Sequence, residues 1–199
     1  MTDTKEKILS VSLELFAKNG YEAVSVSDIS GALGITKGAL YKHYKNKRDI
    51  FDSIVKRMYD IDAERSREYG VPENTYENGV DEYAKTSVED VKKFTAAQFE
   101  FWTEDKFASN FRKMLMLEQY RDGRSAELYS GCLTDGPIEY MRDIFAEMIK
   151  NGVLKNADPL MLAIEYYAPM YLLMNTANIP DKKALLQKYI YKFFKENTK

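Results

Sequence analysis

The sequence has very few of the residues that stabilise small secreted folds or build catalytic centres. Its 199 residues include one cysteine, one histidine and one tryptophan, and glycine and proline together number only 15. The single cysteine, Cys132, excludes a framework of disulfides within the chain and suits a reducing compartment. The scarcity of glycine and proline argues against both a disordered chain and a fold rich in β-turns.

Long hydrophobic runs are also missing. The longest stretch without a charged residue, 166–180, has 15 residues and includes two prolines and two asparagines. It is too short and too polar to cross a bilayer. The charged start, MTDTKEKILS, has no apolar core of the kind that a signal peptide needs. We therefore expect a cytoplasmic protein with no membrane partner.

Sequence signatures of enzymes are absent as well. The chain has no G-x-S-x-G motif, no P-loop and no cluster at metal-ligand spacing. Its 31 acidic residues could include a catalytic carboxylate pair, but most of them fall on the solvent faces of predicted helices. We expect no catalytic residues, no metal site and no cofactor, and an enzyme is the less favoured alternative.

Helical periodicity runs along nearly the whole chain, and the alternation typical of strands is hard to find. The predicted helices cover residues 4–19, 26–33, 36–44, 47–69, 76–103, 105–121, 125–151, 159–178 and 181–197. Gly136-Pro137 is expected to break the helix over 125–151, and Pro169 to kink the one over 159–178. The pattern predicts an all-α fold of nine or ten helices.

The stretch between Ser25 and Phe51 has the clearest local signals. Ser25 and Asp28 have the spacing of a capping box, which would start a helix at residue 26. Gly34 suits the left-handed position after that helix, and Thr36 can cap the next one. These signals predict a helix, a tight turn and a second, short helix.

Positive charge is concentrated in the same stretch. Five cations follow Gly34 with no acid before Asp49, namely Lys37, Lys42, Lys45, Lys47 and Arg48. Residues 1–58 contain 10 basic and 7 acidic residues, whereas the remainder contains 19 and 24. An ordinary solvated face would explain the charge alone. Together with the capped helix pair, the charge favours a basic head steered toward a polyanionic duplex.

This stretch closely resembles the DNA-reading segment of TetR-family transcriptional repressors. The residues that coincide with the family signature are Asp28-Ile29, Gly34-Ile35-Thr36-Lys37-Gly38, Leu40-Tyr41, His43-Tyr44 and Asn46-Lys47. The resemblance covers roughly residues 5–58. It implies an N-terminal three-helix helix-turn-helix (HTH) domain at 1–47 that binds DNA. A larger helical domain at 48–199 would bind a ligand and form the dimer.

The expected DNA-binding residues are Ser25, Thr36, Lys37, Gly38, Ala39, Tyr41, Lys42, His43 and Lys47. Thr36 and the free N–H groups beside it can hold a phosphate, and Lys37 can reach a phosphate or a guanine edge. Gly38 would let the backbone approach the groove, and Ala39 offers a methyl contact to thymine.

The resemblance assigns further roles in the same segment. Tyr41 and His43 resemble the family's pair of phosphate-positioning residues, and Lys47 resembles its phosphate clamp. Lys42 is expected to read bases beside Lys37. A lone histidine is more often a structural or surface residue, but within this motif phosphate contact is favoured for His43, and a metal site is not expected.

For the larger domain, the resemblance implies a cavity that takes a small hydrophobic or aromatic effector. The expected lining residues are Phe99, Trp102, Met114, Tyr120, Tyr166 and Met170. Such side chains are more often part of a core, which is the competing interpretation. Cys132 as a thiol sensor is a weaker alternative.

We also expect a homodimer formed through the helices near 159–178 and 181–197. Two recognition helices would then lie about 34–36 Å apart, which requires a palindromic DNA operator. The sequence thus predicts a repressor that a ligand releases from double-stranded operator DNA. A structural helical adaptor is the remaining alternative, and it would leave the capped basic motif unexplained.

Overall fold

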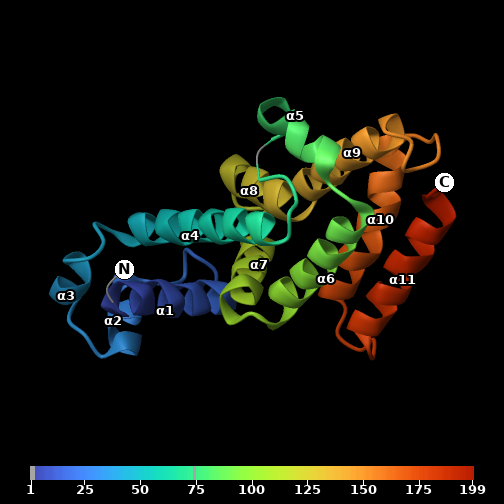
Figure 1. The fold of residues 1–199 in the computed structure, drawn as a ribbon. Coiled ribbons are helices and arrows are strands. Elements are labelled where there is room, and N and C mark those ends of the chain that lie inside the picture. The colour runs from blue at the N-terminus through green and yellow to red at the C-terminus, as the bar shows by residue number, and fades with distance from the viewer. Residues whose placement is uncertain (1–2, 74) are drawn as a thin grey trace. The chain divides into compact units, whose positions relative to one another are not determined.

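The computed structural model describes residues 3–73 and 75–199, and within them the chain forms eleven α-helices (Figure 1). They are α1 Asp3–Asn19, α2 Val26–Leu33, α3 Lys37–Tyr41, α4 Lys47–Glu68, α5 Tyr76–Lys85, α6 Val88–Glu104, α7 Lys106–Glu118, α8 Gly123–Leu133, α9 Asp135–Lys150, α10 Pro159–Asn175 and α11 Lys182–Asn197. In the described residues, β pairing is limited to an isolated bridge between Leu154 and Thr198. The prediction of an all-α fold is confirmed.

The helix predicted over 76–103 is divided into α5 and α6, which raises the helix count above the expected nine or ten. Thr86 ends α5 with an extended backbone. Ser87 then begins α6, because its hydroxyl accepts a hydrogen bond from the backbone N–H of Asp90 at 3.1 Å. The Asp90 carboxylate in turn accepts the backbone N–H of Ser87 at 3.2 Å. This is a capping box like that of Ser25, and its spacing could have been read from the sequence.

The break predicted at Gly136-Pro137 is displaced by a few residues. α8 ends at Leu133, and α9 begins at Asp135, so Gly136 lies in the first turn of a helix. A β-carbon at position 136 would collide with the backbone carbonyl of Gly131. Gly136 therefore permits a close approach of two backbone segments, and the helix turns at Thr134. Further along, α10 continues through Pro169 to Asn175.

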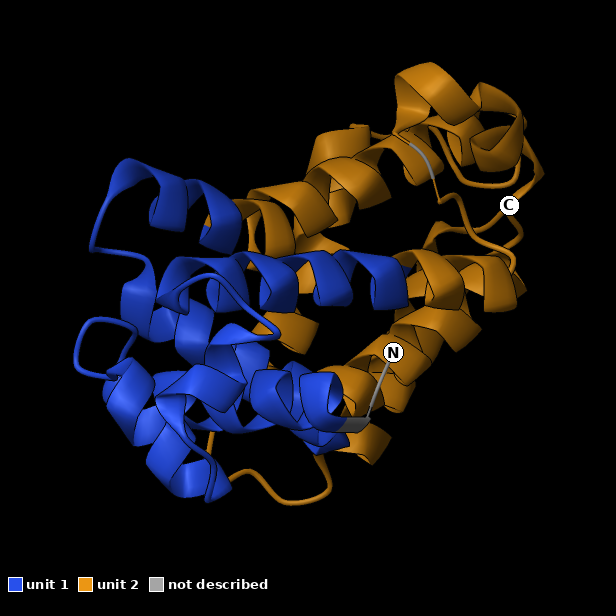
Figure 2. Ribbon diagram, turned by 90° about the vertical axis from the view of Figure 1, so that its left-hand side faces the viewer, with its two compact units in different colours: residues 1–62, 104–129 blue, residues 63–103, 130–199 orange. Residues whose placement is uncertain are grey.

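The chain divides into two compact units, one of residues 1–62 and 104–129 and the other of residues 63–103 and 130–199 (Figure 2). The first unit includes α1, α2, α3, most of α4 and all of α7. The domain boundary predicted at 47/48 falls inside this unit. That boundary remains a prediction about function, since it separates the expected DNA-binding residues from the rest.

The first unit has a core built on the apolar stripe predicted for α1. Ile8, Leu9, Leu13 and Phe16 are all buried, and α1 packs against α7. A ring cluster continues this core, since the centroid of Tyr21 lies 5.2 Å from that of Phe16. The short helices α2 and α3 are thus attached to a helical base that includes a distant part of the chain.

The second unit is centred on aromatic side chains from α9, α10 and α11. The rings of Phe145, Tyr166, Phe193 and Phe194 contact one another with centroid distances between 4.9 and 6.2 Å. The Tyr166 hydroxyl, which is buried with them, donates to Thr95 Oγ1 at 2.9 Å. Among the helices of the described residues, none is both long and apolar enough to cross a membrane.

Candidate nucleic-acid interface

The start of α2 has the capping box that the sequence predicts. The Asp28 carboxylate accepts hydrogen bonds from the Ser25 backbone N–H at 2.7 Å and from the Ser25 hydroxyl at 2.6 Å. The Asp28 backbone N–H donates to Ser25 Oγ at 3.2 Å. The hydrogen bonds from Ser25 lower the pKa of the Asp28 carboxyl. The Ser25 side chain thus caps the N-terminus of α2, the first helix of the HTH pair.

The turn after α2 depends on a left-handed residue at Gly34, whose φ is 66°. Its N–H donates to Gly31 O at 3.1 Å, and the N–H of Ile35 donates back to Ser30 O at 3.0 Å. This is the pairing of a Schellman motif, in which a residue with a β-carbon would be strained. Thr36 follows in an extended conformation and accepts the N–H of Ala39 on its hydroxyl at 3.1 Å. The predicted helix, turn and helix are confirmed.

The second helix is shorter than the predicted 36–44, because α3 ends at Tyr41. The next residues form turns in which the N–H groups of His43 and Tyr44 both donate to Leu40 O. The side chain of Tyr44 is buried, and its hydroxyl donates to Lys5 O of α1 at 3.3 Å. Burial raises the pKa of Tyr44 to about 12. Leu40 and Tyr44 therefore anchor α3, and the residues between them are left toward solvent.

The outer face of α3 is basic and partly aromatic. Leu40 is fully buried, whereas Lys37, Gly38, Lys42 and half of Tyr41 are exposed. No acid of the described residues forms a salt bridge with Lys37 or Lys42. A β-carbon at position 38 would meet only Thr36 Oγ1, at 3.9 Å. The fold itself does not require a glycine there, which fits a need for close approach by a partner.

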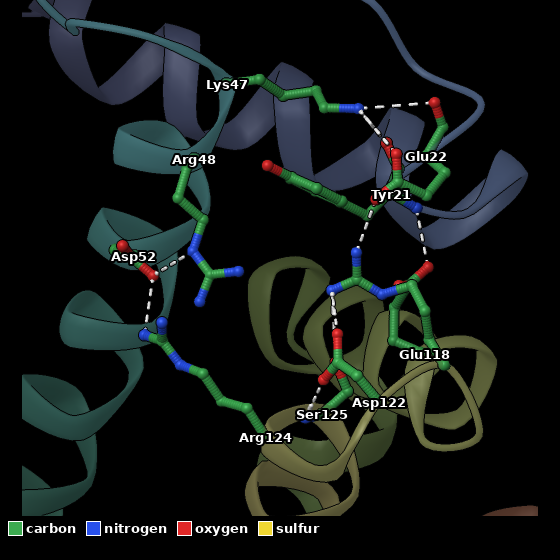
Figure 3. A network of polar contacts seen from close by, with 10 residues as sticks. Tyr21, Glu22, Lys47, Arg48, Asp52, Glu118, Asp122, Arg124 and Ser125 are labelled. Carbon is green, nitrogen blue, oxygen red and sulfur yellow. Dashed lines mark hydrogen bonds and ion pairs between the residues drawn. The ribbon is translucent and has the colours of Figure 1, made fainter.

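Lys47 is engaged in a way that the sequence did not predict. Its Nζ donates to the backbone carbonyl of Tyr21 at 2.7 Å and lies 4.1 Å from the centroid of the Tyr21 ring (Figure 3). The Glu22 carboxylate is 3.9 Å away. Lys47 at the start of α4 thus holds the turn before α2. Its expected role as a phosphate clamp remains a prediction, and it would require this nitrogen to exchange partners.

A polar network joins the same turn to the end of α7 (Figure 3). Buried Glu118 accepts the backbone N–H of Tyr21 at 2.8 Å and forms an ion pair with Arg121 Nε at 2.6 Å. Arg121 also pairs with Glu22 at 2.7 Å, and its guanidinium lies 5.0 Å from the Tyr21 ring centroid. One arginine thus connects two acids that are distant in the sequence.

Beside it, Asp52 of α4 pairs with two further arginines. Arg48, one turn earlier on the same helix, lies 3.0 Å from its carboxylate, and Arg124 lies 3.1 Å from it (Figure 3). Sequence reasoning missed Glu118, Arg121 and Asp52. No short-range pattern links them to the HTH, because their partners are up to 99 residues away.

The six expected ligand-binding residues are not brought together as one lining. Phe99, Trp102, Tyr166 and Met170 are buried in the second unit, whereas Met114 belongs to the core of the first. Tyr166 is packed among aromatic rings, as the competing core interpretation holds. A groove of about 230 Å³ in the second unit is lined by none of the six, but by Glu89, Lys92, Lys93, Ala96, Gln187, Ile190 and Tyr191.

For Tyr120, the prediction of an enclosed lining residue is wrong, since 90% of the side chain is exposed. α7 ends at Glu118, and Tyr120 lies in the turn that follows. The helix predicted over 105–121 therefore ends before this residue.

Comparison with known proteins agrees with the geometry of the HTH. Residues 8–54, which include all of α2, the turn and α3, match the family model described as bacterial regulatory proteins of the tetR family. This N-terminal segment is therefore similar to the DNA-binding segment of TetR-family regulators. The resemblance seen in the sequence is therefore confirmed, and the matched residues are those that build the basic face.

Curated relatives match mainly in the same region. The transcriptional regulator AcrR of Shigella flexneri is 42% identical over 52 residues, which are 26% of this chain and 24% of AcrR. The regulator YerO of Bacillus subtilis, described as uncharacterized, is 35% identical over 107 residues, or 53% of this chain and 34% of YerO. The matches thus span only a quarter to a third of these relatives, which are named as transcriptional regulators and not as enzymes.

Solved structures share the fold over the whole chain. The complex of SmeT with triclosan has a TM-score of 0.71 and 20% identity, and the match covers 100% of this chain and 93% of SmeT. SmeT is described as the repressor of a multidrug efflux pump of Stenotrophomonas maltophilia. At this identity the likeness shows the TetR-family fold alone.

Proposed function

We propose that this TetR-family protein is a repressor that reads a palindromic operator with α2, the turn and α3 of each subunit. The observation that carries the proposal is the exposed face of α3. There, Lys37 and Lys42 flank Tyr41 and form no salt bridge with an acid of the described residues, on a helix that capping and buried Leu40 hold in place. Duplex DNA offers the phosphates and base edges that such a face needs.

The proposed division of labour follows from exposure. Lys37 and Lys42 would reach phosphates or guanine edges, while Tyr41 and His43 position the backbone of the duplex. Gly38 would allow the α3 backbone to come close to the groove, because no side chain intervenes there. Phosphate contacts hold the protein in register, and the few base contacts select the sequence.

A homodimer is part of the proposal, because a palindromic site needs two readers. α10 exposes several large apolar side chains, namely Leu160, Met161, Ile164 and Leu172, and α11 exposes Leu185 and Tyr191. Burying such residues against a second copy is favourable. The helices expected to form the dimer thus have the apolar surface that an interface requires.

The proposal includes release by a small hydrophobic or aromatic effector. Energetically, release requires only that the ligand bind better to the form of the protein that cannot bind the operator. The SmeT complex contains triclosan, which is a small aromatic molecule. That finding concerns SmeT and supports the ligand class for this chain by likeness of fold.

The test measures affinity for duplex fragments taken from upstream of the gene for this protein and its neighbours. We expect Lys37→Ala, Tyr41→Ala and Lys42→Ala each to weaken binding. Each lost phosphate contact should also flatten the dependence of log K on log salt concentration by roughly 0.9. Lys56→Ala is the matched control, since Lys56 is exposed on α4 and already paired with Asp60 at 2.7 Å.

Wild-type affinity in all three variants would contradict the assignment of α3 as the reader. No retardation of any duplex at low salt would favour the helical adaptor instead. Gly38→Ala separates binding from folding. Because position 38 has free space within the protein, its thermal midpoint should not fall, whereas duplex affinity should.

A further inference from the structure

Within the second unit, Arg65 near the end of α4 is packed between aromatic rings. Its guanidinium carbon lies 4.3 Å from the ring centroid of Phe101 and 5.6 Å from that of Tyr69. Its Nε donates to Oε1 of buried Gln98 at 3.3 Å. The guanidinium is thus held in a defined place by two residues of α6 and by Tyr69, the residue that follows α4.

One part of this guanidinium has no partner. The terminal nitrogen Nη2 is buried and reaches no hydrogen-bond acceptor, and no acid of the described residues pairs with Arg65. Arg67, two residues later, is exposed and forms an ion pair with Glu73. The absence of a partner at Arg65 is therefore a property of that position and not of this part of α4.

A buried polar group without a partner is costly, and proteins ordinarily pair it. The buried acid of the same unit illustrates the rule, because Glu147 accepts the Tyr76 hydroxyl at 2.6 Å and Lys150 Nζ at 3.0 Å. The rings beside Arg65 offset part of the cost through cation–π attraction. They give Nη2 no hydrogen-bond acceptor, however, so this nitrogen stays without a partner.

The chemistry of the missing partner follows from this geometry. The edge of a guanidinium presents parallel N–H donors that match the two oxygens of a carboxylate. Aromatic rings continue away from the site, since Tyr69 lies 6.1 Å from Phe94, and Phe94 lies 6.3 Å from Tyr140. A molecule recognised here should combine a carboxylate with an apolar, ring-bearing body.

We propose that Arg65 binds the carboxylate of the effector, which is an aromatic organic acid. Gln98 holds the guanidinium by accepting from Nε, and Nη2 supplies the donor that the free protein leaves unused. The proposal rests on the ligand-released repressor described above, and it names the chemical class of the effector and the residue that selects its charge.

The test compares 2-naphthoate with 2-naphthamide, which have the same ring body and differ in the charged group. Calorimetric titration of the DNA-free protein should give a Kd for the naphthoate roughly tenfold to a hundredfold below that for the amide. Arg65→Met should remove this difference, and the matched control Arg67→Met should preserve it. Arg65→Lys, which keeps the charge and loses the paired donors, should retain part of it.

Equal binding of acid and amide by the wild-type protein, including binding of neither, would overturn the proposal. A difference that persists in Arg65→Met would do the same. The thermal midpoint gives a second measure. Arg65→Met removes a buried nitrogen that has no partner, so it should leave the midpoint unchanged or raise it. A clear fall would show that Arg65 is a structural residue and would also overturn the assignment.

The titration is done without DNA, so the outcome is separable from that of the proposed function. If the acid is preferred but no duplex is bound, the repressor assignment fails and the anion site stands. If duplexes are bound but the acid has no advantage, the repressor assignment stands and the anion site fails.

Discussion

Arg121 in the first unit and Arg65 in the second show two opposite treatments of an arginine inside a helical protein. Arg121 has the acids Glu118 and Glu22 within 2.7 Å, whereas Arg65 has no acid among the described residues. Both guanidiniums also lie near aromatic rings, at 5.0 Å from Tyr21 and 4.3 Å from Phe101. The aromatic contact is shared, and the ionic partner is the difference.

This difference separates an arginine that holds a structure from one that is available to a ligand. Arg121 connects the end of α7 to the turn before α2, so its charge serves the conformation of the HTH. Arg65 has a buried nitrogen, Nη2, from which no described residue accepts a hydrogen bond. A protein retains such a cost where another molecule supplies the missing partner.

The largest expected effect tests the first half of this comparison. Arg121→Ala leaves the buried Glu118 carboxylate without its cation, so the free energy of unfolding should fall by about 3 kcal/mol. The measurement is denaturant unfolding. Arg124→Ala is the matched control, because Arg124 is largely exposed and pairs only with Asp52, and it should cost less than about 1 kcal/mol. Equal losses in both variants would remove the structural role assigned to Arg121.

A smaller effect tests whether the stability of the HTH also depends on the backbone conformation of its turn. Gly34 has a positive φ, so Gly34→Ala should lower the free energy of unfolding by about 1 kcal/mol. Gly31 lies within α2, and a β-carbon at this position would meet no atom within 4 Å. Gly31→Ala should therefore raise the free energy of unfolding by up to about 1 kcal/mol. Changes of the same sign would show that side-chain contacts, and not backbone conformation, control this turn.

The smallest effect concerns pH and the second unit. Hydrogen bonds from Tyr76 and Lys150 lower the pKa of the Glu147 carboxyl in the folded protein. Stability from this acid is therefore present above its ordinary pKa of about 4.5 and is lost as the pH falls through the lowered value. Tyr76→Phe should reduce the thermal midpoint at pH 7, and the difference from wild type should shrink below about pH 4.

Tyr120→Phe is the control for that measurement, because 90% of the Tyr120 side chain is exposed. A Tyr76→Phe difference that did not change with pH would show that the hydroxyl acts through packing and not through the carboxylate. In that case Glu147 would no longer serve as the example of a paired buried charge in the second unit, against which Arg65 is compared.

The parts of the molecule that could be predicted are those that depend on nearby residues. The capping box at Ser25, the left-handed turn at Gly34 and the cap at Thr36 all join residues within five positions. Their physics is local, so spacing is sufficient evidence. The break between α5 and α6 belongs to the same class, and the Ser87-Asp90 spacing that marks it was available.

Other features depend on contacts between distant segments. The bond between Tyr21 and Glu118 joins residues 97 apart, and neither residue is unusual where it stands. Periodicity identifies an inward face but does not tell a cavity wall from a core, so the ligand-binding role expected for Tyr166 remains a prediction. Periodicity also does not show where a helix ends. The predicted helix over 105–121 included Tyr120, whereas α7 ends at Glu118.

Gly136 has a consequence for how the sequence can vary. At the corner between α8 and α9, the carbonyl of Gly131 occupies the space that a side chain at 136 would need. The reverse is not true, because a β-carbon at 131 would meet nothing within 4 Å. Over evolutionary time the two glycines should therefore drift unequally. Position 131 is free to acquire side chains, while position 136 stays glycine for as long as this corner is kept.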